Sequence, residues 1–183
     1  MWEWSKTAVK KKKLLPPCNS LTVTVSSSQP NSKEFIPSPS EMKDILMVKI
    51  QQLGLKNLEL KECTYHPQTW DDMCKDAVEY QRIRKSFLKL IGYSYEQECR
   101  NMGFDDEDII LLKSKKSPEN YNTHLKIPLD FGGRLSFQNL GLIRSHPCHD
   151  KIHSLIEMQI GNCFLKKHKI IYIPWFEGMF YHD

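Results

Sequence analysis

Groups able to bind a metal or accept a proton are concentrated between Thr123 and Ile160. Imidazole and thiol groups bind borderline metals, and imidazole titrates near neutral pH. The rest of the sequence holds no comparable cluster. The candidate groups are His124, His146, Cys148, His149, Asp150 and His153.

A β-hairpin is predicted for the first part of this stretch. Residues 124–129 have the composition of a strand, residues 130–133 have turn chemistry, and residues 134–143 alternate apolar and polar side chains. The predicted turn therefore brings the two halves of the segment together.

A helix is predicted to follow the hairpin. Pro147 suits the first turn of a helix, and an apolar stripe then runs to Gly161. At about 100° per residue, His149 and His153 lie on nearly the same face as Ile156. Both imidazoles are expected to point toward the hairpin, where they either make hydrogen bonds inside a core or bind a metal.

This ββα stretch, about residues 123–153, resembles the HNH endonucleases, which are ββα-metal nucleases. That family has a histidine ending the first strand, a Pro-Leu-x-x-Gly-Gly turn, an Asn-Leu pair and a Cys-His pair near the helix start. His124 stands one residue too far from the proline, and the Cys-His pair comes one residue late. The matching residues are His124, Pro128, Leu129, Gly132, Gly133, Asn139, Leu140, Cys148 and His149.

The resemblance implies a role for each matched polar residue. His124 would be the general base that activates water, and Asn139 would orient that water. His149 would bind a divalent metal, zinc or magnesium, that stabilises the transition state. Thr123 stands where the family has an acidic residue, and Arg144 stands near the place of a structural cysteine. Further candidate ligands are Cys148, Asp150 and His153.

Three alternatives remain open for the same residues. The segment His149-Asp150-x-x-His153 is a variant of the zinc-hydrolase His-Glu-x-x-His helix, with Asp150 as the base. A structural zinc is a second alternative, and its candidate ligands are His146, Cys148, His153 and either Cys163 or His168. The third alternative is a non-enzymatic adaptor that binds another protein through an acidic helical face or the aromatic C-terminus.

Charge is unevenly distributed along the chain. The net charge of +4 resides in the first 13 residues, which hold five lysines and one glutamate. Residues 134–169 form a second basic region, which is compatible with a nucleic-acid backbone as a partner. The candidate nucleic-acid-binding residues are Arg134, Arg144 and Lys151.

Composition divides the chain into a tail and one domain. Residues 1–40 are rich in lysine, serine and proline, which predicts a disordered tail. A hydrophobic fraction of 40% supports a single domain over residues 41–183. Its expected parts are a helical portion at 41–112, the ββα unit at 121–161, and a strand with an aromatic tail at 169–183.

The setting predicted for this domain is nuclear or cytoplasmic, without a membrane partner. No apolar run reaches the ~20 residues of a spanning helix, and lysines 10–13 occupy the place where a secretory signal is apolar. The six cysteines lack regular spacing and are expected to be free thiols. No motif for an organic cofactor is evident.

Capping residues and glycines predict several helices in the first part of the domain. Ser40 can cap a helix that ends before Gly54, and Thr69 can cap a longer helix closed by Gly92. Gly103 is placed to stop a further short helix. The expected fold class is α+β: a helical N-terminal half, then the hairpin, a helix and a final strand. The expected function is an HNH-like domain, either a metal-dependent nuclease or a degenerate relative that binds nucleic acid or protein.

Overall fold

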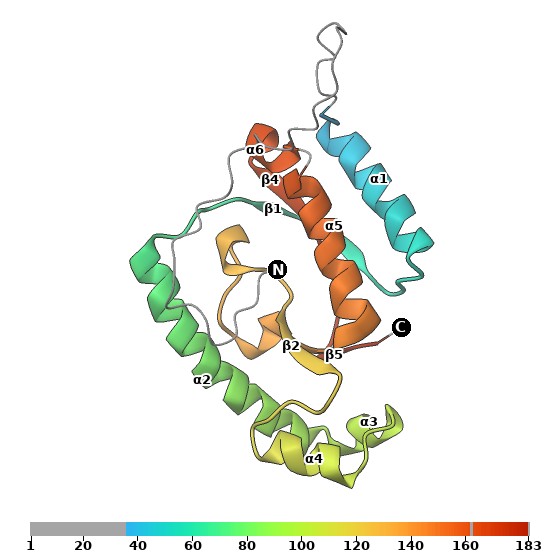
Figure 1. The fold of residues 1–183 in the computed structure, drawn as a ribbon, viewed down its shortest axis with the longest axis vertical. Helices are drawn as coiled ribbons and strands as arrows, with labels where there is room; N and C mark the ends of the chain where they lie inside the picture. Colours follow the sequence, from blue (N-terminus) through green and yellow to red (C-terminus); the bar gives the residue numbers. More distant parts are fainter. Residues whose placement is uncertain (1–35, 162, 183) are drawn as a thin grey trace, which may run out of the picture. The chain divides into compact units, whose positions relative to one another are not determined.

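The structure is a computed structural model that describes residues 36–161 and 163–182. These residues form the expected α+β fold, in which helices are combined with two small β-sheets (Figure 1). The predicted disordered tail falls outside the described residues except for residues 36–40. None of the described helices is long and apolar enough to cross a membrane.

Helix α1, Pro39–Gln52, opens the described domain. Its N-cap is Ser38 rather than the predicted Ser40, because the Ser38 side chain and Glu41 form a capping box. The buried positions recur every four residues, so one face of the helix is apolar. These buried residues are Met42, Leu46 and Ile50.

Helix α2, Trp70–Ser94, is capped by Thr69 as predicted. Gly92 does not end this helix, contrary to the prediction. A Cβ atom at Gly92 would lie 2.7 Å from the backbone nitrogen of Lys113 at the end of α4, Asp106–Lys113. Gly92 therefore allows α2 and α4 to pack closely.

A short helix connects α2 and α4. Helix α3, Glu96–Asn101, is followed by Gly103 with a φ of 90°, which is the predicted left-handed stop. Asp105 then caps α4 by accepting a hydrogen bond from the backbone of Asp108.

Two sheets complete the fold. In the first sheet, β2 (Tyr121–Leu125) pairs antiparallel with β3 (Leu140–Arg144), and β5 (Phe180–Tyr181) pairs parallel with β3. In the second, β1 (Glu59–Thr64) pairs antiparallel with β4 (Ile170–Trp175). The predicted hairpin is therefore present, but its strands are shorter, and the predicted final strand joins β1 instead of the hairpin.

The connection between β2 and β3 is long rather than a tight turn. It contains two single 3-10 turns, Leu129–Phe131 and Phe137–Asn139. After β3, residues Ser145–His149 form a wide turn before helix α5, Asp150–Gly161. His146 is extended, and α5 begins at Asp150, three residues after the predicted start at Pro147. A short helix α6, Phe164–His168, leads into β4.

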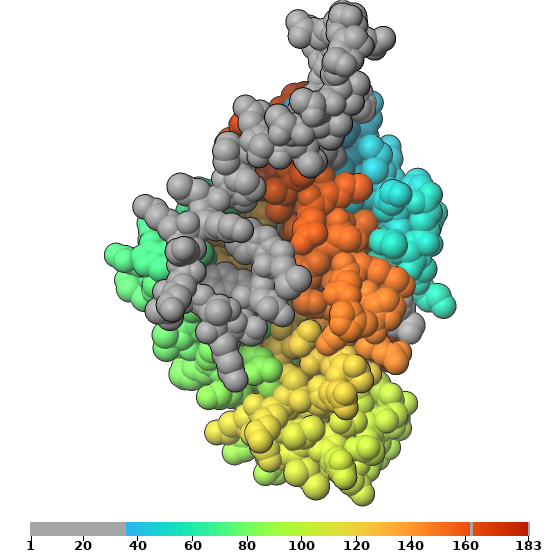
Figure 2. Space-filling model, viewed as in Figure 1, coloured from blue at the N-terminus to red at the C-terminus, as the bar shows by residue number. Residues whose placement is uncertain are grey.

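The two faces of the hairpin contact different hydrophobic clusters. Leu140 and Leu142 of β3 pack with Phe87 and neighbouring residues of α2, α3 and α4; we call this the α2 face. Ile143 packs with α1, α5, α6 and β4; we call this the α5 face. The surfaces of α1 and α5 lie directly against each other in Figure 2. Successive strand residues therefore point into different clusters.

Candidate metal centre

Three imidazoles converge on the α5 face of the hairpin. His124 comes from β2, His149 is the last residue of the wide turn before α5, and His153 lies four residues later in α5. The ring centroid of His124 is 5.2 Å from that of His149 and 5.4 Å from that of His153. The potential ligand atoms of all three side chains lie within 4.8 Å of one another. The structure thus brings together three histidines that could hold a metal ion.

Strand register explains why His124 faces α5. His124 pairs with Gly141, while its neighbour Thr123 pairs with Leu142 of the α2 face. Side chains of adjacent strand residues point to opposite faces of the sheet, so the His124 side chain lies on the α5 face and the Thr123 side chain on the α2 face. Tyr80 of α2 donates a hydrogen bond of 2.9 Å to the Thr123 carbonyl and fixes the strand from behind.

The Nε2 atoms of His149 and His153 have a separation that suits either a hydrogen bond between them or a shared metal ion. These two atoms are 3.1 Å apart. Two nitrogens bound to tetrahedral zinc at about 2.0–2.1 Å stand roughly 3.3 Å apart. His124 stands farther back, since the centroids of His149 and His153 are only 4.3 Å from each other.

The pKa of each of the three imidazoles is lowered, which favours the neutral form that binds a metal. Burial, reinforced by His149 and His153, holds the pKa of His124 well below its ordinary value. Burial and the neighbouring His153 lower the pKa of His149 to about 4. Burial also lowers the pKa of His153, although Glu157 and Asp150 act in the opposite direction.

The Nε2 atom of His124 tests whether these residues fit a metal. His124 is only 5% exposed, and within the part of the chain that the structure describes its Nε2 has no hydrogen-bond partner. A buried polar atom without a partner costs free energy. A cation beside His149 and His153, or a water molecule bound to it, would relieve that cost. The donor set therefore fits a divalent metal.

The other predicted ligands do not join this group. Cys148 is fully buried in the hydrophobic cluster of the α5 face. Asp150 is exposed, and its carboxylate pairs with the exposed imidazole of His146. Two of the four predicted ligands, His149 and His153, therefore lie in the group, because residues one position from His149 point away from the hairpin by about 100°.

The alternative structural zinc site is not assembled either. The His146 side chain is exposed on the surface, whereas Cys148 is fully buried in the core. His168 is engaged elsewhere, with its Nε2 3.0 Å from the carbonyl of Pro37. Of the predicted members of that set, His153 alone belongs to the three-histidine group.

Asn139 holds the loop between β2 and β3. Its amide donates to the carbonyls of Ile127 and Arg134 at 2.8 and 3.0 Å, and its carbonyl accepts from the Ile127 backbone at 2.9 Å. Gly133 completes this clamp, since a Cβ there would lie 1.9 Å from the Ile127 carbonyl oxygen. Asn139 therefore positions the loop, whereas the resemblance implied that it would orient water.

The predicted nucleic-acid-binding residues surround the hairpin at three places. Arg134 is exposed in the loop, Arg144 is exposed at the end of β3, and Lys151 is half-buried in the first turn of α5. Sequence reasoning missed Lys126, which is buried on the same hairpin face as His124 and donates to the carbonyl of Gly178. Lys126 is two residues from His124, and this spacing would have predicted that both side chains lie on the same face of a strand.

Comparison with known proteins leaves the site without an assigned activity. The chain is 31% identical over 126 residues to an uncharacterised protein, YhhZ, of Escherichia coli (strain K12). That match covers 68% of this chain and 31% of the relative, so the chain spans about a third of the relative's length. No protein-family model matches the chain, and no solved structure matches it.

Proposed function

We propose that this domain is a metal-dependent nuclease that hydrolyses phosphodiester bonds. The observation that carries the proposal is the convergence of His124, from the hairpin, on His149, which directly precedes α5, and His153, in α5. This arrangement has the form that the HNH resemblance implies, a base on the strand facing metal ligands on the helix. A bound divalent cation would supply positive charge to the phosphate and the leaving oxygen.

The geometry favours a division of roles among the histidines. His149 and His153, with Nε2 atoms 3.1 Å apart, are the proposed metal ligands. His124 stands back from this pair and is the proposed general base. A neutral imidazole can accept the proton of a water molecule as its oxygen attacks phosphorus; burial favours this neutral form of His124 and also lowers its basicity.

Zinc is the metal that this donor set favours. Imidazole nitrogen suits zinc and other late transition metals, whereas magnesium prefers oxygen ligands at octahedral geometry. Among the described residues the group contains no carboxylate. We therefore propose zinc rather than magnesium as the metal.

Metal content and cleavage together test the proposal. His124→Ala is expected to keep the metal and lose cleavage by at least about 100-fold, the lower range for a general base. His153→Ala is expected to lose both. His66→Ala is the matched control, because His66 is an exposed histidine outside the three-histidine group. Cleavage by metal-free protein, or full activity of His124→Ala, would overturn the proposed mechanism.

Nucleic acid is the proposed substrate, with Arg134, Arg144 and Lys151 contacting phosphates. Replacing all three with glutamine should weaken binding and reduce the slope of log K against log salt by roughly 0.9 per lost contact on a duplex. Lys43→Gln is the control, since Lys43 is exposed on α1 and lies outside the loop, β3 and α5, which carry the three candidate residues. Binding that is absent or independent of salt would remove nucleic acid as the substrate.

A structural metal centre in an interaction domain is the second candidate. The observation that favours it is the burial of His124, which is 5% exposed, whereas an open catalytic position was expected. Stoichiometric zinc without cleavage of any nucleic acid would support this candidate. If the purified protein contains no metal, both metal-based candidates fail and the non-enzymatic adaptor hypothesis is the one that stands.

A further inference from the structure

An aromatic ring from the C-terminal segment occupies the position opposite His124 on the hairpin. His124 of β2 and Gly141 of β3 are register partners, so their side-chain positions lie on the same face, the α5 face. A Cβ atom at Gly141 would lie 2.4 Å from Cζ and 2.7 Å from Cε2 of Phe176. The Phe176 ring therefore rests on the backbone of Gly141, in the space that another residue would fill with its own side chain.

This position places the ring beside the three-histidine group. The Cβ atoms of directly paired strand residues are about 4.5–5.5 Å apart. The edge of the Phe176 ring is accordingly no more than about 8 Å from the Cβ of His124, and the imidazole extends from that Cβ on the same face. Phe176 belongs to the buried cluster of the α5 face and is only 1% exposed. Its ring thus forms an apolar wall next to His124.

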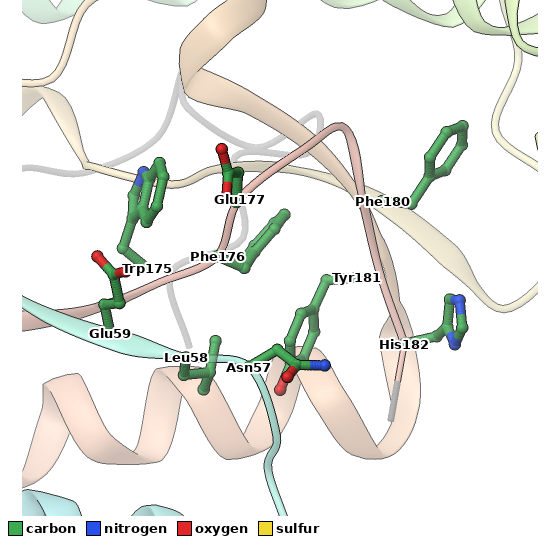
Figure 3. A pocket seen from close by; sticks show the side chains of 9 residues that line it. All are labelled: Asn57, Leu58, Glu59, Trp175, Phe176, Glu177, Phe180, Tyr181 and His182. Atoms are coloured by element: carbon green, nitrogen blue, oxygen red, sulfur yellow. The ribbon is translucent and has the colours of Figure 1, made fainter.

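Two neighbours hold the Phe176 ring in this place. The Tyr181 ring packs against it with centroids 4.9 Å apart, and the Tyr181 hydroxyl donates a 2.9 Å hydrogen bond to the carbonyl of Lys56. The Lys126 ammonium lies 5.1 Å from the centroid of the Phe176 ring and donates to the carbonyl of Gly178. Figure 3 shows Phe176 and Tyr181 on the two arms of one turn. Because both neighbours are bonded to the backbone, they restrict movement of the ring.

We propose that Phe176 is a positioning residue for His124. Its ring, seated on Gly141, restricts the space open to the His124 imidazole and keeps that imidazole directed at His149 and His153. The groups around a metal site orient the side chains that act there, and an apolar shell limits the access of water. This role rests on the proposed function, in which His124 is the general base.

NMR of the metal-free protein with labelled histidine and phenylalanine tests the position of His124 directly. In the parent, nuclear Overhauser effects should connect the ring protons of His124 with those of Phe176, His149 and His153. Gly141→Ala should weaken the contacts between His124 and the other two histidines, because the added methyl group must displace the Phe176 ring. The absence of a Phe176–His124 contact in the parent, or unchanged contacts of His124 in Gly141→Ala, would overturn the proposal.

A second substitution supplies the rescue. Leucine lacks Cε2 and Cζ, the two ring atoms that would meet a Cβ at Gly141, so Phe176→Leu removes the clash in Gly141→Ala. The added methyl group then fills part of the space that the ring leaves. The double variant should therefore regain the parent's contacts of His124, although each single variant loses them, because residues in contact have non-additive effects. A double variant that departs further from the parent than either single variant contradicts the proposal.

Turnover gives a readout that a purely structural role would not change. In Gly141→Ala and in Phe176→Leu, kcat should fall at least about tenfold while KM and zinc content stay those of the parent, since a base misplaced by about 1 Å can cost 100-fold. Phe87→Leu is the matched control, because Phe87 is a fully buried phenylalanine of the α2 face, and it should keep kcat. An equal loss of kcat in Phe87→Leu would count against a specific role of Phe176. A parent that cleaves nothing would remove the nuclease proposal, and the contacts of His124 would still decide the role of Phe176.

Discussion

The two faces of the β2–β3 hairpin differ in chemistry although they share the same ten strand residues. The α2 face is apolar: its buried partners include Phe87, Ile91 and Leu112. The α5 face combines an apolar cluster with three histidines and a buried lysine. Each face also holds one buried polar atom that lacks a partner among the described residues, Thr123 Oγ1 on one side and His124 Nε2 on the other.

This comparison separates stability from the proposed chemistry. Among the described residues the lone hydroxyl on the α2 face belongs to no group of potential metal ligands, so it is a local cost. On the α5 face the lone nitrogen stands beside two further imidazoles, so a metal ion or its bound water would satisfy it. The same local observation therefore has a different meaning on each face.

The largest effect is expected from removing an anchor of the α2 face. Phe87 is fully buried and packs against Phe137, so Phe87→Ala should lower the free energy of unfolding by about 3–5 kcal/mol. Urea denaturation measures this loss. The affinity of the folded protein for zinc should not change, and a loss of affinity as large as that in His153→Ala would show that the two faces are not independent.

Zinc should stabilise the protein through the α5 face. At a free zinc concentration 100 times the dissociation constant, the free energy of unfolding should rise by about 2.7 kcal/mol. Thermal or urea unfolding with and without zinc measures this increase. His153→Ala should abolish it and His66→Ala should retain it, whereas equal stabilisation of both variants would place the metal outside the three histidines.

The metal-free protein should lose stability in acid. His149 has an ordinary pKa of 6.5 and a folded pKa of about 4, so below pH 6.5 the unfolded chain binds a proton that the folded protein does not. Stability is therefore greatest above pH 6.5 and falls as the pH drops toward 4. Solvent screening at the incompletely buried helical histidines should keep this effect below that of Phe87→Ala.

Urea midpoints measured in the presence of a chelator between pH 7 and pH 4.5 test this dependence. His149→Gln, which cannot be protonated in this range, should show a shallower fall than the parent. An equally steep fall in the variant would assign the acid sensitivity to other groups.

The smallest expected effect lies at the hydroxyl of Thr123. Thr123→Val keeps the side-chain shape and removes the buried oxygen, so it should stabilise the fold by roughly 1 kcal/mol. Chemical denaturation measures the change, and zinc affinity should remain that of the parent. Destabilisation would mean that the hydroxyl has a partner, such as a buried water.

Sequence patterns predicted those features whose determinants are local. The cap at Thr69, the left-handed Gly103 and the apolar stripe of α5 follow from neighbouring residues, and the structure contains all three. The helical spacing of four also placed His149 and His153 on one face, directed toward the hairpin. The α+β class follows from these same local signals.

Tertiary structure decided the features that depend on register and packing. The pairing of His124 with Gly141 selects the face on which His124 lies, and a shift of one residue would place Thr123 there instead. From its neighbours alone, Gly92 was predicted to end a helix. Its actual role is close packing against Lys113, which belongs to a distant segment and so cannot be inferred from local sequence. Cys148 and Asp150 are sequence neighbours of His149, but their directions around the turn send one into the core and the other to the surface. The amino-acid sequence alone thus determined which groups could bind a metal, while packing between the hairpin and α5 brought three of them together, because a metal site requires atoms to meet in space.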